Sequence, residues 1–403
     1  MEGGNRLNDW WVWEQVPLVP EPSGLAADHY HLFEKDLDLA RSLNHNAYRF
    51  SIEWSRIEPS PGEFSEEELT HYSQVIQACR ARKLEPIVTL HHFTSPFWFT
   101  KRGGWTSPES PQLFARYTRK VVERLGSRVL WWVTINEPTV LVYYGYLTGI
   151  WPPAKRSLQQ ALGALRNMIE AHQLAYGVIH DWAELEKWLV PHVGLAHHLR
   201  GYHPCRQRSV MDRLCAYFRH ELGNQWTMKK CRGTMDFIGV NYYTRDFVRW
   251  SAWNPMQFFL GRACLPGHHP SAGPRSGMDW EIYPEGLWWV LMELKKYRLP
   301  ILITENGVCS EDDNVRWDFI RSHLREMCKA MTDGAQVVGY LYWSLIDNFE
   351  WAHGFSPRFG LIEVDYATQE RHVRPSALRL AEVIRTRKLT SEKAETKAVP
   401  SAK

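Results

Sequence analysis

Short apolar runs, each followed by a loop and a stretch with helical periodicity, constrain the fold most strongly. The seven runs are Asn46–Ser51, Pro86–His91, Val129–Ile135, Val193–His197, Phe237–Tyr242, Ile301–Thr304 and Val338–Ser344. Two of the intervening stretches carry helix-start signals, Ser65 followed by three glutamates and Pro284 followed by Glu285. Strands that alternate with helices on this scale predict parallel strands and crossover helices, in an α/β barrel or a doubly wound sheet.

Polar side chains at the ends of these runs favour the barrel. They are Arg49, Glu53, Trp54, His91, His92, Asn136, Glu137, Asn241, Tyr243, Glu305, Asn306 and Trp343. In a (β/α)₈ barrel all such strand ends converge on the face that carries the active site, whereas a doubly wound sheet concentrates them at one switch point. No glycine-rich phosphate motif follows any run. We therefore predict one (β/α)₈ domain over residues 1–386, followed by a disordered tail over 387–403.

Composition limits the partners that this chain can have. Its 48 basic and 45 acidic residues leave a net charge of only +3, which argues against a nucleic-acid or membrane partner. Seven cysteines without metal-ligand spacing predict free thiols in a reducing compartment, and the absence of a leader-like start predicts a cytoplasmic location. Twenty tryptophans fit either a large core or platforms on which sugar rings stack.

Two glutamates, Glu137 in TINEP and Glu305 in ITENG, directly follow apolar runs. Retaining glycoside cleavage needs such a pair about 5–5.5 Å apart, one carboxyl to protonate the leaving oxygen and one to attack the anomeric carbon. At that distance their repulsion is about 3 kcal/mol at an effective dielectric constant near 20, which moves one pKa by about two units. Arg49 is suited to keep Glu305 ionised. Taken singly, each motif also fits a turn, a hairpin or a simple ion pair.

Seven segments resemble, in order, the signatures of glycoside hydrolase family 1, the β-glucosidase family. They are NAYRFSIEWSRIEPSPGEF, TLHHFTSPFWF, TINEP, DFIGVNYYTR, WEIYPEGL, ITENG and YWSLIDNFEWAHGFSPRFGL. The resemblance implies a (β/α)₈ barrel and double-displacement hydrolysis without metal or cofactor. It also implies site residues: Glu137 as acid/base, Glu305 as nucleophile, Arg49, Asn241 and Tyr243 as their support, and His92, Asn136, Trp343, Glu350, Trp351 and Phe359 in sugar binding.

The chain departs from the family pattern at two places. Phe93 stands where members often have Trp, and the family resemblance is already under way at Glu2, after the point where members have a first strand ending in a Gln that binds the sugar. We therefore expect a gap in the barrel between Asn46–Ser51 and Val338–Ser344, with poor stability and weak activity. The alternative is that Met1–Trp13 folds back into the gap, although this segment is polar and glycine-rich.

The sequence thus predicts a retaining exo-β-glycosidase, in the first place a β-glucosidase. Its substrate is expected to be a small-molecule or oligosaccharide β-glycoside, and Glu350 is expected to exclude 6-phosphorylated sugars by repulsion. Two alternatives remain open. One is a non-catalytic or impaired sugar-binding protein of the same fold, and the other is a transglycosylase, which uses the same intermediate. Aglycone preference is expected to depend on the Leu265–Gly277 loop.

Overall fold

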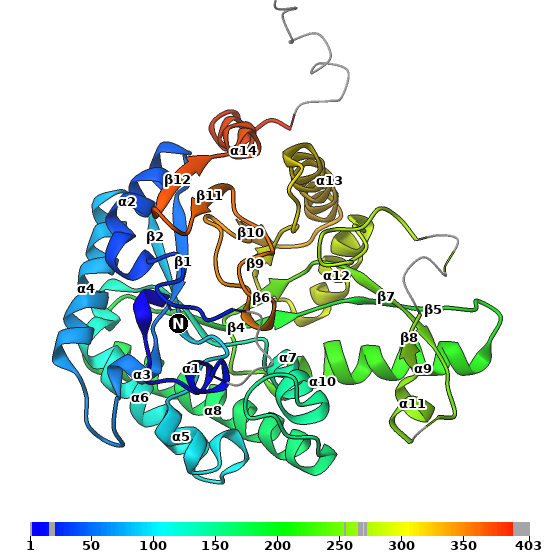
Figure 1. The fold of residues 1–403 in the computed structure, drawn as a ribbon, viewed down its shortest axis with the longest axis horizontal. Helices are drawn as coiled ribbons and strands as arrows, with labels where there is room; N and C mark the ends of the chain where they lie inside the picture. The colour runs from blue at the N-terminus through cyan, green and yellow to red at the C-terminus, as the bar shows by residue number, and fades with distance from the viewer. Residues whose placement is uncertain (1, 16–20, 254, 265–268, 270–271, 390–403) are drawn as a thin grey trace, which may run out of the picture.

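Seven parallel strands form the main sheet of the protein (Figure 1). A computed structural model describes residues 2–15, 21–253, 255–264, 269 and 272–389. The strands, in spatial order, are β1 (Ala47–Ser51), β2 (Glu85–His91), β3 (Trp131–Asn136), β4 (His192–His198), β6 (Phe237–Asn241), β9 (Ile301–Asn306) and β10 (Val337–Tyr342). Each run predicted from the sequence overlaps one of these strands, and the sheet curves into an incomplete barrel.

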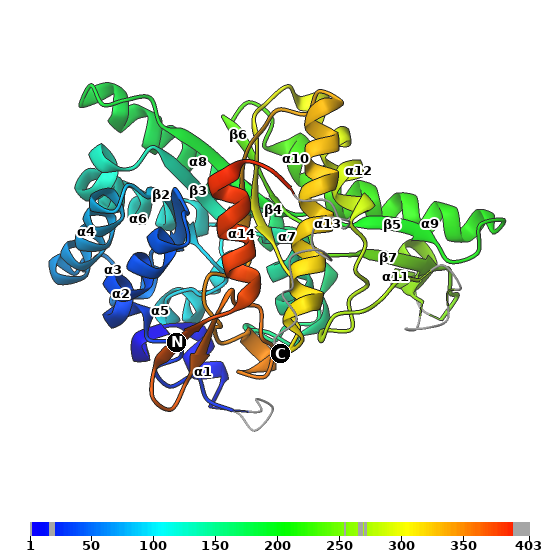
Figure 2. The same cartoon turned by 90° about the horizontal axis from the view of Figure 1, so that it is seen from above.

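Most of the helices lie on the outer side of the sheet, and a few extend away from it (Figures 1 and 2). They are α1 (Asp9–Trp13), α2 (His29–Ser42), α3 (Trp54–Ile57), α4 (Glu66–Ala81), α5 (Phe97–Lys101), α6 (Ser110–Leu125), α7 (Pro138–Val142), α8 (Leu158–Leu185), α9 (Val210–His220), α10 (Trp226–Lys230), α11 (Pro255–Leu260), α12 (Glu285–Leu294), α13 (Asp313–Thr332) and α14 (Pro375–Thr386). Both predicted helix starts are confirmed. Ser65 caps α4 by accepting a hydrogen bond from the Glu68 amide, and α12 begins at Glu285. None of the described helices combines the length and apolar character that a membrane crossing requires.

The central strands are apolar on both faces because side chains inside the barrel and helices outside it exclude water from both. In β9 every residue is buried, and β2, β3 and β6 are buried almost throughout. The main core lies between these strands and the helices, where Leu90, Ile135 and Val240 belong to one large apolar cluster. A rigid layer of this kind holds the ends of the strands, and hence the polar residues there, in fixed positions.

Two small sheets extend from the barrel. One pairs β11 (Ile362–Asp365) with β12 (Glu370–Val373), and the other has the order β5 (Gly201–Pro204), β7 (Arg245–Arg249), β8 (Arg262–Ala263). A disulfide joins Cys205 and Cys264, which immediately follow β5 and β8. The prediction of seven free thiols is therefore wrong at these two positions. Both cysteine amides donate to carbonyls of β7, so this strand brings together residues that are 59 positions apart.

The main sheet is open between β1 and β10. In the described part of the chain, β1 pairs only with β2 and β10 pairs only with β9. The expected gap is thus confirmed. The alternative that the first residues fill it is wrong, because Glu2–Gly4 forms a 3-10 turn and Asp9–Trp13 forms α1. Both strands beside the gap are only partly buried, in contrast to β9.

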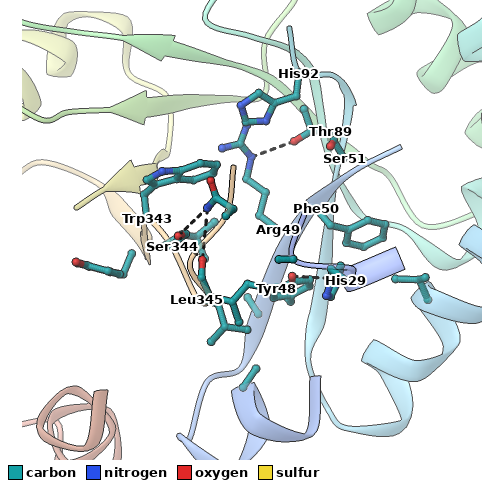
Figure 3. A pocket seen from close by; sticks show the side chains of 18 of the residues that line it. His29, Tyr48, Arg49, Phe50, Ser51, Thr89, His92, Trp343, Ser344 and Leu345 are labelled. Atoms are coloured by element: carbon teal, nitrogen blue, oxygen red, sulfur yellow. Dashed lines mark hydrogen bonds between the residues drawn. The ribbon is translucent and has the colours of Figure 1, made fainter. Parts of the chain in front are cut away.

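A cavity of about 300 Å³ lies at this gap (Figure 3). Its outer part is lined by Tyr48 and Phe50 of β1 and by Leu345, which follows β10. At its inner end it reaches Arg49 and His92, which belong to the predicted active site. The apolar side chains expected to face the gap are therefore present, and the cavity extends from the helical layer to the interior of the barrel.

The open edge predicts uneven protection of the backbone. We expect amides of β1 and β10 to exchange with solvent about tenfold faster or more than those of β3, because each edge strand lacks a partner on one side. Hydrogen exchange followed by mass spectrometry on peptides covering 47–51, 337–342 and 131–136 measures this. Equal protection of the three peptides would contradict an open sheet in solution.

The predicted disordered tail lies mostly outside the described residues, which end at Leu389. The predicted aglycone loop Leu265–Gly277 is also only partly described, since residues 265–268 and 270–271 fall outside. Both therefore stay predictions.

Candidate active site

Polar side chains from several strand ends meet inside the barrel. Because the main strands are parallel, their carboxyl ends lie at one edge of the sheet. Glu305 is the fifth residue of β9. Glu137 directly follows β3 and is the N-cap residue of α7, which begins at Pro138. The backbone of Glu137 has a φ of 45°, and its amide donates to the Ala196 carbonyl of β4 at 2.8 Å. This bond fixes the strand-to-helix turn that directs the carboxyl inward.

Glu305 is 4% exposed and has two strong donors. Nη1 of Arg49 donates to its Oε1 at 2.6 Å, and the Tyr243 hydroxyl donates to its Oε2 at 2.6 Å. Each carboxylate oxygen therefore has a donor of its own, which holds the side chain in one orientation. The predicted association of Arg49 and Tyr243 with Glu305 is present in the structure.

Glu137 is 6% exposed and has a different pair of partners. Nδ2 of Asn241 donates to its Oε1 at 2.7 Å, and Nδ1 of His198 lies 3.2 Å from the same oxygen. Both partners thus bind one side of the carboxyl group. His198 was not identified from the sequence, because a single histidine at the end of an apolar run carries no distinctive spacing.

Arg49 connects four strands through its guanidinium group. Besides Glu305 of β9, it donates to Oγ1 of Thr89 on β2 at 3.0 Å and to Oδ1 of Asn136 on β3 at 2.6 Å. Asn136 in turn donates from Nδ2 to Nε2 of His92 at 3.1 Å. Burial, followed by the charge of Arg49, lowers the pKa of His92 to about 3, so that this ring is neutral and can accept. The network fixes two predicted sugar-binding residues.

The two glutamates titrate as a coupled pair. Burial raises the pKa of Glu305 to about 7, opposed by Arg49 and aided by repulsion from Glu137. Burial also acts on Glu137, but His198 and Asn241 outweigh it and lower its pKa. The unliganded site therefore keeps one proton near neutral pH, which the two carboxyl groups share. Arg49 acts in the expected direction, since its charge favours the ionised form of Glu305, but desolvation has the larger effect on the Glu305 pKa.

Aromatic rings line the same region. The His92 ring lies 5.8 Å from both Trp343, which follows β10, and Trp351. Phe93, which stands where the family resemblance predicts Trp, packs against Trp351 at 5.0 Å between ring centroids. Phe359 is 2% exposed and contacts Tyr243 at 6.4 Å between ring centroids, so it supports the residue that binds Glu305. Its contact with a sugar stays a prediction.

Glu350 contributes a third carboxyl group. Its Oε2 is buried and has no hydrogen-bond partner among the described residues. Burial, with repulsion from Glu305 and Glu137, raises its pKa to about 8. A buried oxygen without a partner is costly, and a sugar hydroxyl is suited to satisfy it. Among the described residues, no group of three His, Cys, Asp or Glu side chains is arranged to hold a metal ion.

Comparison with known proteins assigns the family. The model of Glycosyl hydrolase family 1 matches residues 14–229 and 221–389. The chain belongs to glycoside hydrolase family 1. It is 32% identical to Beta-glucosidase A of Thermotoga maritima, over 95% of this chain and 92% of that protein, and 32% identical to a Beta-galactosidase of Pyrococcus woesei, over 90% and 88%. A solved beta-glycosidase from Pyrococcus horikoshii superposes with a TM-score of 0.91 at 39% identity, covering 100% of this chain and 95% of that one.

Membership of family 1 makes this chain a glycoside hydrolase with the (β/α)₈ architecture of the family. The site residues named from the sequence meet within this family 1 barrel, joined by hydrogen bonds around Arg49 and by ring contacts around His92. The structure adds a group that sequence reasoning missed, in which His198 contacts Arg200 and Arg200 contacts Asp246.

Proposed function

We propose that this chain is a retaining, exo-acting β-glycosidase that hydrolyses unphosphorylated β-glycosides, in the first place β-glucosides. The observation that carries the proposal is the pair of buried glutamates at two strand ends, each held by its own donors. Such a pair can divide the work of glycoside cleavage between a nucleophile and an acid/base. No cofactor is needed for this chemistry.

The proposed mechanism has two steps. In the first, Glu305 attacks the anomeric carbon while Glu137 protonates the leaving oxygen, which gives a covalent glycosyl-enzyme. In the second, Glu137 removes a proton from water, which attacks the same carbon and releases Glu305. Arg49 and Tyr243 are suited to receive the negative charge that returns to Glu305 in this step.

The first step requires the shared proton of the two glutamates to lie on Glu137. Moving a proton within a coupled pair costs about 1.4 kcal/mol for each unit of pKa difference, which substrate binding can supply. The glycosidic oxygen placed beside Glu137 then becomes the acceptor. Proton transfer within the pair is therefore compatible with the assigned roles.

The sugar pocket is proposed to combine stacking with hydroxyl recognition. Trp343 provides a flat surface for the ring, and His92, Asn136, Glu350 and Trp351 provide polar groups around it. The names of the relatives include both a glucosidase and a galactosidase, which supports a pocket that tolerates either sugar.

A second candidate is impaired catalysis, favoured by the cavity that reaches Arg49 and His92. Transglycosylation is a third outcome, since a second sugar can replace water in the second step.

A panel of nitrophenyl glycosides tests the proposal. We expect hydrolysis of the β-glucoside, weaker or equal hydrolysis of the β-galactoside and β-fucoside, and no hydrolysis of the α-glucoside. Proton NMR during the first minutes should show the β-anomer of the free sugar first, because two displacements retain configuration. An α-anomer formed first would refute the retaining mechanism. Activity no higher than that of the Glu305→Ala variant would instead support the impaired candidate.

A further inference from the structure

A chain of polar contacts runs from the mouth of the barrel to Glu137. Nε of Arg200 donates to Nε2 of His198 at 2.7 Å, and Nδ1 of His198 lies 3.2 Å from Oε1 of Glu137. On the other side, Nη1 of Arg200 lies 3.2 Å from both carboxylate oxygens of Asp246. Glu137 directly follows β3, His198 is the last residue of β4, Arg200 follows β4, and Asp246 lies in β7.

The contact with Arg200 determines where the His198 ring carries its proton. A guanidinium group only donates hydrogen bonds and stays charged in proteins, so Nε2 of His198 must be the unprotonated, accepting nitrogen. A neutral imidazole then carries its one proton on Nδ1, which donates to Glu137. The side chains of His198 and Glu137 are 10% and 8% exposed, so water competes weakly for this bond. Asp246 balances the charge of Arg200 beside them.

The same geometry distinguishes the two oxygens of Glu137. Both donors, His198 and Asn241, bind Oε1. A carboxyl proton on Oε1 would point toward the hydrogens that His198 and Asn241 donate to that oxygen. The exchangeable proton of Glu137 therefore belongs on Oε2. The glycosidic oxygen must then approach on the Oε2 side. The two donors therefore fix which oxygen of Glu137 takes part in proton transfer.

We propose that His198, whose ring proton the contact with Arg200 holds on Nδ1, is a positioning residue that directs the catalytic proton of Glu137 to Oε2. The inference rests on the proposed role of Glu137 as acid/base. His198 does not touch the reacting atoms and acts through Glu137. Because a hydrogen bond donated by His198 favours the ionised carboxyl, it should also lower the pKa at which Glu137 loses its proton.

Other titratable groups lie close to these four residues. They are present in every variant of His198 or Arg200 proposed below. Those around Glu137 and His198 are His92, His197, Tyr243, Glu305 and Glu350. Those around Arg200 and Asp246 are Tyr144, Tyr202 and Arg219. Shifts that appear only when His198 or Arg200 is replaced are therefore assigned to the contacts of these two residues.

The test compares the pH dependence of kcat/KM among variants. Its alkaline limb is the fall in kcat/KM at high pH that follows loss of the proton from the acid, Glu137. In His198→Leu we expect the limb to move up by roughly one pH unit, since two to three hydrogen bonds can lower a carboxyl pKa by about two units. In His198→Asn the amide replaces the Nδ1 donor, and the limb should stay in place. In Arg200→Met, Nε2 becomes free to bind a proton and His198 becomes a cation beside Glu137. The limb should then move down, in the opposite direction to His198→Leu.

The double variant His198→Asn/Arg200→Met separates the ring from the charge of Arg200. Without a titratable ring the downward shift should disappear. His180→Asn is the matched control, because His180 also pairs with a carboxylate, Asp236, but lies on α8. The alkaline limb of kcat/KM in His180→Asn should lie at the same pH as in the unsubstituted protein.

Two results would overturn the proposal: an unmoved limb in His198→Leu, or an upward shift in Arg200→Met. If a variant fails to fold, ¹⁵N NMR of the unsubstituted protein can locate the ring proton of His198. A proton on Nδ1 and none on Nε2 supports the proposal. A proton on Nε2 contradicts it. An alkaline limb that persists in Glu137→Gln refutes the proposed function itself. If the alkaline limb disappears in Glu137→Gln but does not move in His198→Leu, only the role of His198 is refuted.

Discussion

Glu305→Ala should lower kcat by about 10⁴-fold or more on every glycoside, because removal of a nucleophile ends the covalent route. Glu137→Ala should depend on the leaving group. On cellobiose, loss of the general acid should cost about 10²–10⁴-fold. On a dinitrophenyl glycoside, whose leaving group needs little protonation, the first step should remain fast. Steady-state rates on the two substrates measure the difference.

Azide distinguishes the two roles by stereochemistry. In Glu305→Ala azide should attack the substrate directly and give the α-glycosyl azide, and in Glu137→Ala it should attack the glycosyl-enzyme and give the β-glycosyl azide. Glu85→Gln, at the opposite end of β2 from the site, serves as the control and should keep native rates. If Glu137→Ala lost equal activity on dinitrophenyl glycosides and cellobiose, the assignment would be wrong. This test assigns the two roles independently of where the pair holds its shared proton.

Discrimination against 6-phospho-glycosides should increase with pH. The pKa of Glu350 is raised to about 8, so this carboxyl is mostly neutral at pH 6 and ionises as the pH rises through 8. A sugar phosphate is already close to fully ionised above its second pKa near 6. Repulsion therefore grows between pH 6 and 9. We expect kcat/KM for the β-glucoside to exceed that for its 6-phosphate by roughly a hundredfold or more at pH 9, since facing like charges cost several kcal/mol.

The ratio of kcat/KM for the β-glucoside to kcat/KM for its 6-phosphate is the quantity to follow with pH. Ionisation of Glu137 and Glu305 affects both substrates alike and therefore cancels in this ratio. Glu350→Gln keeps the shape of the side chain and should make the ratio independent of pH above about pH 7, where the phosphate itself is close to fully ionised. A ratio near one at pH 9 in the unsubstituted protein would exclude Glu350 from phosphate discrimination. This prediction refines the one made from the sequence, in which Glu350 was treated as a carboxylate at neutral pH.

Sequence reasoning located the strands well because both faces of each are covered. A strand such as Pro86–His91 reads as a continuous apolar run, which is visible without knowledge of the fold. It also placed Glu137, Glu305 and Arg49 at strand ends, and parallel pairing brings these ends together. The gap between β1 and β10 followed from the count of runs and the family resemblance.

Features that depend on tertiary contact were not visible. The Cys205–Cys264 bond joins strands whose pairing cannot be deduced from spacing. The partners of Glu137 were missed in part for the same reason, since Asp246 lies 109 positions from Glu137 and reaches it only through Arg200 and His198. The balance of burial against the Arg49 charge likewise depends on how deeply the site is enclosed, which a sequence does not specify.

The open edge between β1 and β10 changes what holds the catalytic distance constant. In a closed barrel an unbroken ring of backbone hydrogen bonds fixes the circumference, and opposite strands cannot move apart independently. Here that ring is interrupted, so the width of the barrel depends on links across its interior. Arg49, bound to β2, β3 and β9 at once, is such a link. The residue that orients Glu305 thus also limits how far the two halves of the sheet can spread.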